Sequence, residues 1–124
     1  MGKPGKTGFS RIWDAFFYSM KGFASAWRHE AAFRQEMMLA VVLIPLAFWL
    51  AETHIELILL ISSVLLVLLA ELINSSVEAV VDRTGTEHHE LSGRAKDIGS
   101  AVVFLSFVML GVVWGIIAYN RFVI

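Results

Sequence analysis

The chain has 124 residues, of which 57% are hydrophobic, with a mean hydropathy of +0.70 and no cysteine. A chain this apolar is not a small soluble globule, and we expect one domain of the all-α integral membrane class. The absence of cysteine excludes disulfide and thiol chemistry, and the formal net charge of -1 argues against nucleic-acid binding.

The first element expected, after a tail at residues 1–8, is a helix over residues 9–28. Aromatic and other apolar residues recur there at spacings of three and four, with basic residues between them. This pattern predicts an amphipathic helix that lies along the membrane surface, and packing of the same stripe against the helix bundle is the alternative. The segment lacks the apolar core and cleavage site of a signal peptide.

Three membrane-spanning helices are expected next, at residues 30–51, 56–82 and 92–120. The last contains an uncharged stretch that is about 33 Å long as a helix, which is enough to cross a bilayer. Pro45 is expected to bend the first span. Glu52, His54 and Glu56 are interpreted as solvated loop charge between the first two spans.

The basic residues predict the orientation of these spans. Of the ten, only Arg121 follows the last span, whereas the others precede the first span, lie in its first turns or lie near the loop at residues 83–91. By the positive-inside rule, the N-terminus and this loop face the cytoplasm and the C-terminus faces out.

The second span carries an acidic stripe formed by Glu71, Asn74, Glu78 and Asp82. These residues fall within roughly 60° of one direction on a helix that turns about 100° per residue. Ionisable groups at membrane depth are costly, so the stripe predicts a functional site. Glu71 and Glu78 lie about 10 Å apart along the axis, too far to share one proton. The deeper Glu71 suits a general base, and the shallower Glu78 suits a hard cation.

Three helices are too few to cover this stripe, so we expect a symmetric homo-oligomer. The alternative for Glu71 and Glu78 is a structural role, as acids paired with basic residues of a neighbouring helix. His88 and His89 are interpreted as part of a solvated loop and not as a zinc site.

The last span has further features with simple interpretations. Ser92 is the expected N-cap, and Trp114 is interpreted as an interfacial anchor together with Tyr119. Gly111 and Gly115 form a G-x-x-x-G pair, from which we infer no oligomer.

Three strings resemble the prokaryotic integral-membrane diacylglycerol kinase family. They are Glu30-Ala-Ala-Phe-Arg-Gln-Glu36, Glu71-Leu-Ile-Asn-Ser-Ser-Val-Glu-Ala-Val-Val-Asp-Arg83 and Glu90-Leu-Ser-Gly-Arg-Ala-Lys-Asp-Ile-Gly-Ser100. The resemblance runs from about Thr7 to the start of the last span and is thin between Met37 and Glu56.

This resemblance implies a homotrimer in the bacterial inner membrane, with composite sites at subunit boundaries on the cytosolic side. It implies Mg-ATP-dependent phosphorylation of the diacylglycerol hydroxyl to give phosphatidic acid, and no further protein partner. Glu71 matches the catalytic base, Asn74 matches a polar residue beside it, and Glu30 and Glu78 match the ligands of the Mg2+ that accompanies ATP.

The resemblance also implies two sets of binding residues. The nucleotide-contacting positions are Arg11, Tyr18, Glu30, Glu78, Glu87, His89, Lys96 and Asp97. The lipid-contacting positions are Arg11, Ser19, Ala31, Ala32, Phe33, Arg34, Gln35, Trp49, Glu71 and Ser100.

Departures from the family at Arg28, His29 and the first span leave the headgroup and acyl preference open. An undecaprenol kinase of the same superfamily is the alternative function, and a small proton-coupled transporter is a more distant one. The sequence has neither a P-loop nor a protein-kinase glycine loop, so a nucleotide must be held by side chains of the helices.

Overall fold

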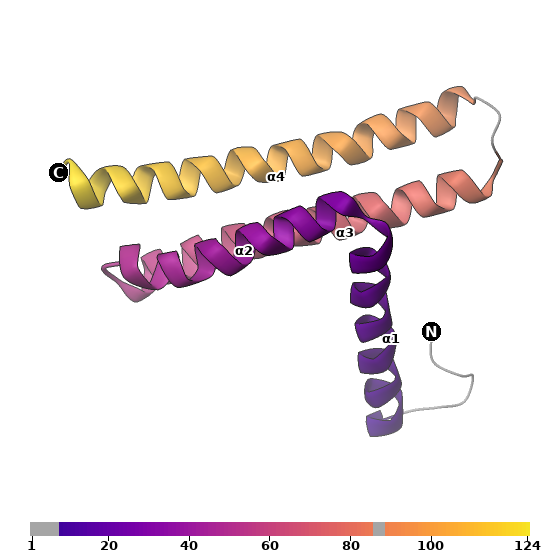
Figure 1. Ribbon diagram of the computed structural model, residues 1–124, viewed down its shortest axis with the longest axis horizontal. Coiled ribbons are helices and arrows are strands. Elements are labelled where there is room, and N and C mark those ends of the chain that lie inside the picture. The colour runs from indigo at the N-terminus through magenta and orange to yellow at the C-terminus, as the bar shows by residue number, and fades with distance from the viewer. Residues whose placement is uncertain (1–7, 86–88) are drawn as a thin grey trace.

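The computed structural model describes residues 8–85 and 89–124, and every element in those ranges is helical. The four helices are α1 (Gly8–His29), α2 (Ala31–Leu50), α3 (His54–Arg83) and α4 (Glu90–Phe122). Figure 1 shows α2, α3 and α4 running alongside one another, while α1 leaves the bundle steeply. The all-α prediction is confirmed, and the expected helix bounds differ from the observed ones by one or two residues at each end.

Helices α2, α3 and α4 are each long and apolar enough to cross a membrane, as predicted. Large apolar side chains remain exposed along all three, which suits contact with lipid or with other membrane helices. α2 runs without interruption through Pro45. The glycine pair Gly111 and Gly115 has open space around it, because a Cβ added at either position would meet no described atom within 4 Å beyond the backbone of α4 itself.

The corner between α1 and α2 is built around Glu30 and Arg34. Glu30 is the N-cap of α2 and has an extended backbone, and within the described chain its side chain makes no capping hydrogen bond. Arg34 Nη1 donates to the carbonyl oxygens of Trp27 at 2.7 Å and Arg28 at 3.3 Å, near the end of α1. Arg34 therefore satisfies carbonyl acceptors at the end of α1. The Glu30 carboxylate is available for other contacts because it caps no N–H group of α2.

Two further caps differ from the sequence-based interpretation. Thr53 caps α3 by accepting from the Glu56 N–H at 3.1 Å, and the Glu56 carboxylate accepts from the Glu52 N–H at 2.9 Å. Glu56 is thus a capping group and not only loop charge. The cap of α4 is His89 and not Ser92, because His89 Nδ1 accepts from the Leu91 N–H at 3.0 Å.

At the end of the bundle that holds the α2–α3 turn, Ala47, Leu50, Leu60 and Ile117 form the buried core. Arg121 closes this end: its Nη1 donates to the Leu50 carbonyl oxygen at 3.2 Å, and its guanidinium lies 5.5 Å from the centre of the Trp49 ring. This contact joins α4 to the last turn of α2.

A hydrogen bond inside the bundle links α4 to α3. Trp114 Nε1 donates to the hydroxyl of buried Ser63 at 3.1 Å, and this hydroxyl donates to the Leu60 carbonyl oxygen at 2.8 Å. Trp114 therefore has an interhelical role that its interpretation as an interfacial anchor did not include.

We predict that Trp114→Phe lowers the free energy of unfolding by about 1 kcal/mol, because the Ser63 hydroxyl loses its donor inside the bundle. Unfolding in mixed micelles, followed by circular dichroism, measures the loss. Trp27→Phe, on the exposed face of α1, is the matched control. If Trp114→Phe and Ser63→Ala have additive effects in the double variant, the bond does not contribute.

Candidate active site

The acidic stripe of α3 lies where α3 is covered by both α2 and α4. Glu71 is 5% exposed and Asn74 is 9% exposed, so both are buried although both are polar. Glu78 is half-buried and Asp82 is exposed, so burial decreases from Glu71 towards the end of α3. Glu71 is therefore more buried within the bundle than Glu78, and the difference in their depth in the membrane stays a prediction.

Two carboxylates from outside α3 join the stripe. Glu71 lies within electrostatic range of Glu78, of Glu30 at the α1–α2 corner, and of Glu36 on α2. Glu36 has no role in the site predicted from the sequence, because its approach to Glu71 depends on how α2 packs against α3. One Glu36 oxygen, Oε2, is buried and has no hydrogen-bond partner among the described residues.

Asn74 connects the members of this cluster. Its Nδ2 donates to Glu78 Oε1 at 3.3 Å, and its side chain also interacts with Glu71. Its Oδ1 faces Gly99 of α4, where an added Cβ would overlap this oxygen and lie 3.4 Å from the Asn74 Cγ. A glycine at position 99 is what lets α4 approach α3 this closely.

Lys96 lies three residues before Gly99 and bridges the same two helices. Its Nζ is 2.8 Å from Asp82 Oδ1, and it also lies within electrostatic range of Glu78. Asp82, the outermost member of the acidic stripe, therefore joins α3 to α4. A second pair, Arg94 with Glu90 at 3.7 Å, stays within the first turns of α4.

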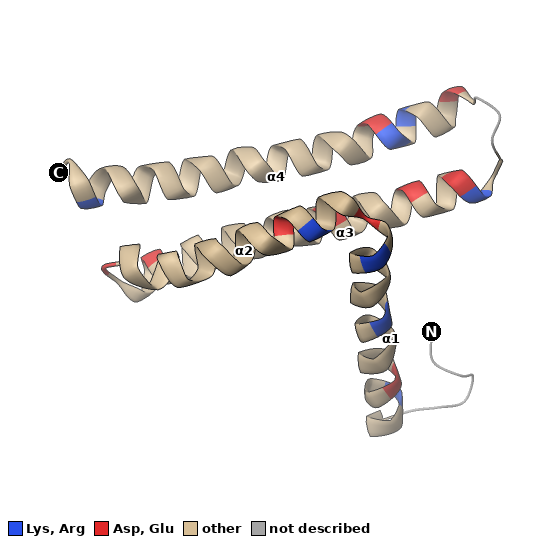
Figure 2. Cartoon of the chain, in the orientation of Figure 1, with Lys and Arg blue, Asp and Glu red and all other residues tan. Residues whose placement is uncertain are grey.

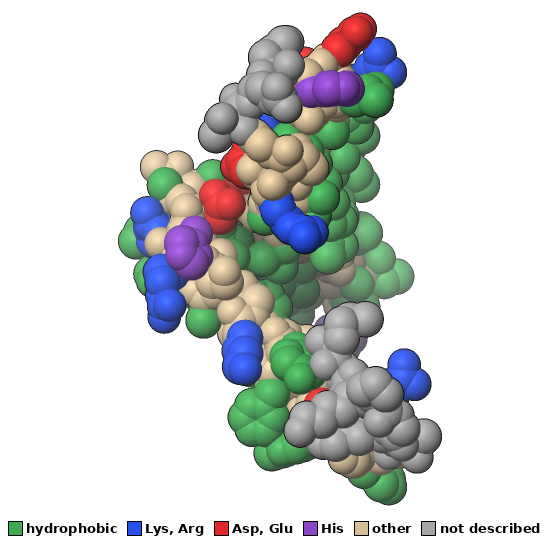
Figure 3. Space-filling view, turned by 90° about the vertical axis from the view of Figure 1, so that its right-hand side faces the viewer, with side chains coloured by type: hydrophobic (Ala, Val, Ile, Leu, Met, Phe, Trp, Pro, Cys, Tyr) green, Lys and Arg blue, Asp and Glu red, His purple; other side chains and the backbone are tan. Residues whose placement is uncertain are grey.

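Charged residues are frequent at the end of the bundle where α3 finishes and α4 begins, as the coloured cartoon in Figure 2 shows. After Asp97, α4 has no charged residue until Arg121. In Figure 3, which faces this end, acidic, basic and histidine side chains are interspersed, and hydrophobic side chains line the flank behind them. Asp97 and Ser100, two of the predicted site residues, are exposed at the start of α4.

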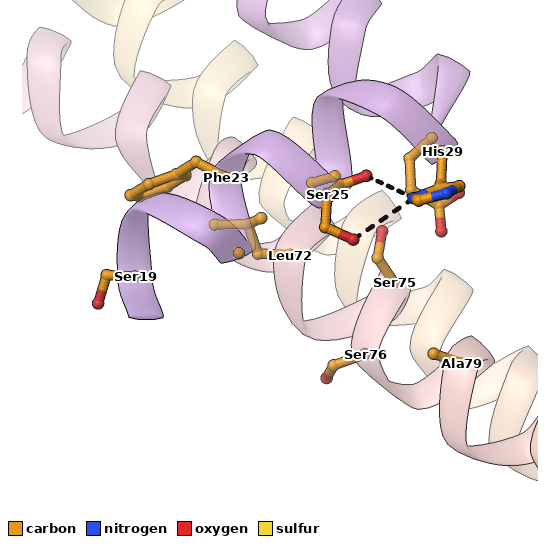
Figure 4. A pocket seen from close by; sticks show the side chains of 11 residues that line it. Ser19, Phe23, Ser25, His29, Leu72, Ser75, Ser76 and Ala79 are labelled. Carbon is orange, nitrogen blue, oxygen red and sulfur yellow. Dashed lines mark hydrogen bonds between the residues drawn. The ribbon is translucent and has the colours of Figure 1, made fainter. Parts of the chain in front are cut away.

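A cavity of about 510 Å³ lies between α1 and α3, beside the acidic cluster (Figure 4). Its wall is apolar around Phe23 and Leu72 and polar around Ser25, His29 and Glu30. The His29 ring is held by its Nδ1, which is 3.0 Å from the Ser25 carbonyl oxygen. The cavity is thus amphiphilic, with its polar part next to one carboxylate of the site. Ser19, a predicted lipid contact, also lines it.

The fold does not bring all predicted residues to one place. Arg11 and Tyr18 lie on α1, away from the bundle, and Trp49 lies at the opposite end of α2, against Arg121. Glu87 and His88 fall outside the described residues.

The predicted lipid-contacting run from Ala31 to Gln35 is divided by the fold. Ala31, Ala32 and Gln35 are exposed, and Arg34 is engaged at the helix corner. Phe33 is only 1% exposed and packs inside the subunit.

No three acidic or histidine side chains of residues 8–85 and 89–124 lie close enough to hold a metal ion by themselves. A cation bound here therefore needs oxygen ligands from another source, such as phosphate or water. Mg2+ typically binds through one or two carboxylates together with substrate phosphates and water. The carboxylates of Glu30 and Glu78 fit that requirement.

Comparison with known proteins bears on what this cluster does. Residues 17–118 match the sequence model of the family described as prokaryotic diacylglycerol kinase. The chain is 59% identical over 109 residues to the diacylglycerol kinase of Haemophilus influenzae, covering 88% of this chain and 92% of the relative. It is 50% identical to the diacylglycerol kinase of Escherichia coli K12 over 116 residues, 94% of this chain and 95% of the relative. It is also 50% identical to that of Pseudomonas aeruginosa over 113 residues, 91% and 92% of the two chains.

We predict that Gly99→Ala destabilises the protein and disturbs the site, because the new methyl group overlaps Asn74 Oδ1 and separates α4 from α3. The expected loss in unfolding free energy is about 1–3 kcal/mol, measured in mixed micelles. Gly111→Ala is the control, since it makes the same change in helix propensity with open space around it. Equal stability of the two variants would contradict the role of the close approach.

Proposed function

Because the chain belongs to the prokaryotic diacylglycerol kinase family, we propose that its acidic cluster transfers the γ-phosphoryl group of ATP to the free hydroxyl of diacylglycerol, giving phosphatidic acid. The observation that supports this site most directly is the gathering of Glu30, Asn74 and Glu78 around Glu71, beside an amphiphilic cavity. Phosphoryl transfer asks a protein mainly to position a hydroxyl and to neutralise phosphate charge.

Glu71 is the proposed general base. It is the most buried carboxylate of the stripe, and Asn74 holds it from the next turn of α3. Its carboxylate accepts the proton of the lipid hydroxyl as the hydroxyl oxygen attacks the γ-phosphorus, and ADP leaves. Asn74 orients both Glu71 and Glu78, so the base and the phosphate-binding part of the site are placed by one amide.

Glu30 and Glu78 are the proposed ligands of the Mg2+ that accompanies ATP. The Glu30 carboxylate is available because it makes no capping hydrogen bond at the start of α2. The ion would neutralise charge on the β- and γ-phosphates. Lys96 supplies a cation at the outer end of the stripe, beside Asp82. The other proposed nucleotide contacts are Asp97, Glu87 and His89.

A homotrimer is proposed because one subunit does not assemble the whole set. Arg11 precedes Glu30 by 19 positions, which is about 28 Å along a straight helix, and α1 points away from the bundle. Arg11 and Tyr18 would therefore meet the nucleotide of a neighbouring subunit. The neighbour would also cover apolar side chains left exposed on α2, α3 and α4.

The lipid is proposed to bind with its glycerol part at the polar end of the α1–α3 cavity. Ser19 lines this cavity, and Ala31 to Gln35 and Ser100 lie on the helices around the cluster. Trp49 follows Gln35 by 14 positions, about 21 Å along α2, so it would contact only the distal part of an acyl chain.

The proposed setting is the bacterial inner membrane, with the N-terminus and the site on the cytoplasmic side and the C-terminus outside. In this setting α1 is an amphipathic surface helix. Phe9, Trp13 and Phe16 are exposed, which suits contact with the lipid interface.

The test of the function is direct. The purified full-length protein is incubated with Mg-ATP and either diacylglycerol or undecaprenol, and lipid phosphate is measured. Transfer to diacylglycerol is expected. Transfer to undecaprenol alone would assign the chain to the other branch of the superfamily, and no transfer to either lipid would remove the kinase proposal.

We predict that Glu71→Gln lowers kcat by at least about 100-fold while the trimer persists, because the amide keeps the shape but cannot accept the proton. Lipid phosphate formation and size-exclusion chromatography measure the two properties. Glu52→Gln, an exposed position at the opposite end of the bundle, is the control. Near-normal turnover of Glu71→Gln would exclude Glu71 as the base.

We predict that Glu78→Gln raises the KM for Mg-ATP more than the KM for diacylglycerol, because one oxygen ligand of the cation loses its charge. Excess Mg2+ is expected to restore part of the lost rate. Steady-state kinetics at varied Mg2+ and fixed ATP measure this. A change confined to the KM for the lipid would argue against metal ligation by Glu78.

A further inference from the structure

We propose that Asp82 is a positioning residue for the nucleotide, which holds the Lys96 ammonium group at the outer end of the acidic stripe. The inference rests on the proposed contact between Lys96 and ATP. It adds Asp82, which has no role in the proposed function, to the residues on which nucleotide binding depends.

Contacts between α3 and α4 hold both the backbone and the ammonium group of Lys96 in place. Its backbone lies one turn before Gly99, where the contact with Asn74 sets the distance between α4 and α3. Its Nζ lies 2.8 Å from Asp82 Oδ1, across the same two helices. A lysine side chain is otherwise flexible, and its rotamer freedom is worth about 2 kcal/mol. The pair therefore orders Lys96 before the nucleotide binds.

Stability alone does not account for this pair. The Lys96 side chain is 47% exposed and the Asp82 side chain is 67% exposed. An exposed ion pair contributes only about 0–1 kcal/mol to folding. The ammonium has three N–H donors, so the contact with Asp82 leaves others free for phosphate oxygens.

The position of Glu78 determines whether the loss of Asp82 weakens or strengthens Mg-ATP binding. Glu78 lies one turn before Asp82 on α3 and also attracts Lys96. Without Asp82, the ammonium would turn towards Glu78, the proposed metal ligand, and would compete with the cation for it. Loss of Asp82 should therefore weaken Mg-ATP binding, although it removes a negative charge from the neighbourhood of the phosphates.

The experiment compares Asp82→Ala, Asp82→Glu and Glu90→Ala in the full-length protein. Glu90 is the matched control, because it is an exposed acid at the same end of the bundle whose partner is Arg94 and not Lys96. Asp82→Ala is expected to raise the dissociation constant of Mg2+ with a non-hydrolysable ATP analogue about fivefold, the upper end for one exposed pair. Asp82→Glu should recover most of the affinity, and Glu90→Ala should bind as the unmodified protein does. The KM for diacylglycerol and the unfolding temperature should stay unchanged in all three variants.

A Lys96→Met background separates this inference from the proposed function. If Lys96→Met weakens analogue binding and Asp82→Ala adds nothing further to it, Asp82 acts through Lys96. If Lys96→Met weakens binding but Asp82→Ala alone binds normally or more tightly, the inference fails while the proposed nucleotide contact stands. If Lys96→Met leaves analogue binding unchanged, both the contact and the inference are overturned.

Discussion

The structure depends on one constraint: a carboxylate and an amide are buried on a helix whose length and composition suit a membrane. Glu71 and Asn74 can be buried there only if other parts of the chain provide polar contacts and exclude lipid. α2 provides Glu36 and the corner at Glu30, and α4 provides the close approach at Gly99. The contacts that build the site are therefore also contacts that pack the helices of the bundle.

The kinase site proposed for this arrangement has no phosphate-binding loop. Soluble nucleotide-binding proteins often use backbone N–H groups at a helix start, but membrane helices have few free backbone donors. Here the donors and acceptors are side chains, which lie on three helices and at one helix corner. Such a site is sensitive to the relative position of the helices, and the α3–α4 contact at Asn74 sets that position near the reacting groups.

Much of the fold followed from periodicity and length. The three long apolar helices and the helix before them were predictable, because each depends on the pattern within one helix. Contacts between helices were not. The Asp82–Lys96 pair, the fit of Asn74 against Gly99 and the approach of Glu36 to Glu71 depend on how helices rotate and translate against each other. The caps at His89 and Glu56 were missed because local hydrogen bonds compete closely at helix ends.

The two ends of the bundle are held very differently. At the end away from the acidic cluster, Arg121 donates a hydrogen bond to the last turn of α2. Trp114, two turns earlier on α4, donates one to Ser63 of α3. At the other end α1 diverges, and a cavity separates it from α3. The acidic cluster thus lies at an end where the Asp82–Lys96 pair and the close approach at Gly99 join α3 to α4, while α1 stands apart. A displacement of α1 away from α3 would leave the register of α2, α3 and α4 unchanged, because the contacts of Arg121 and Trp114 lie at the other end.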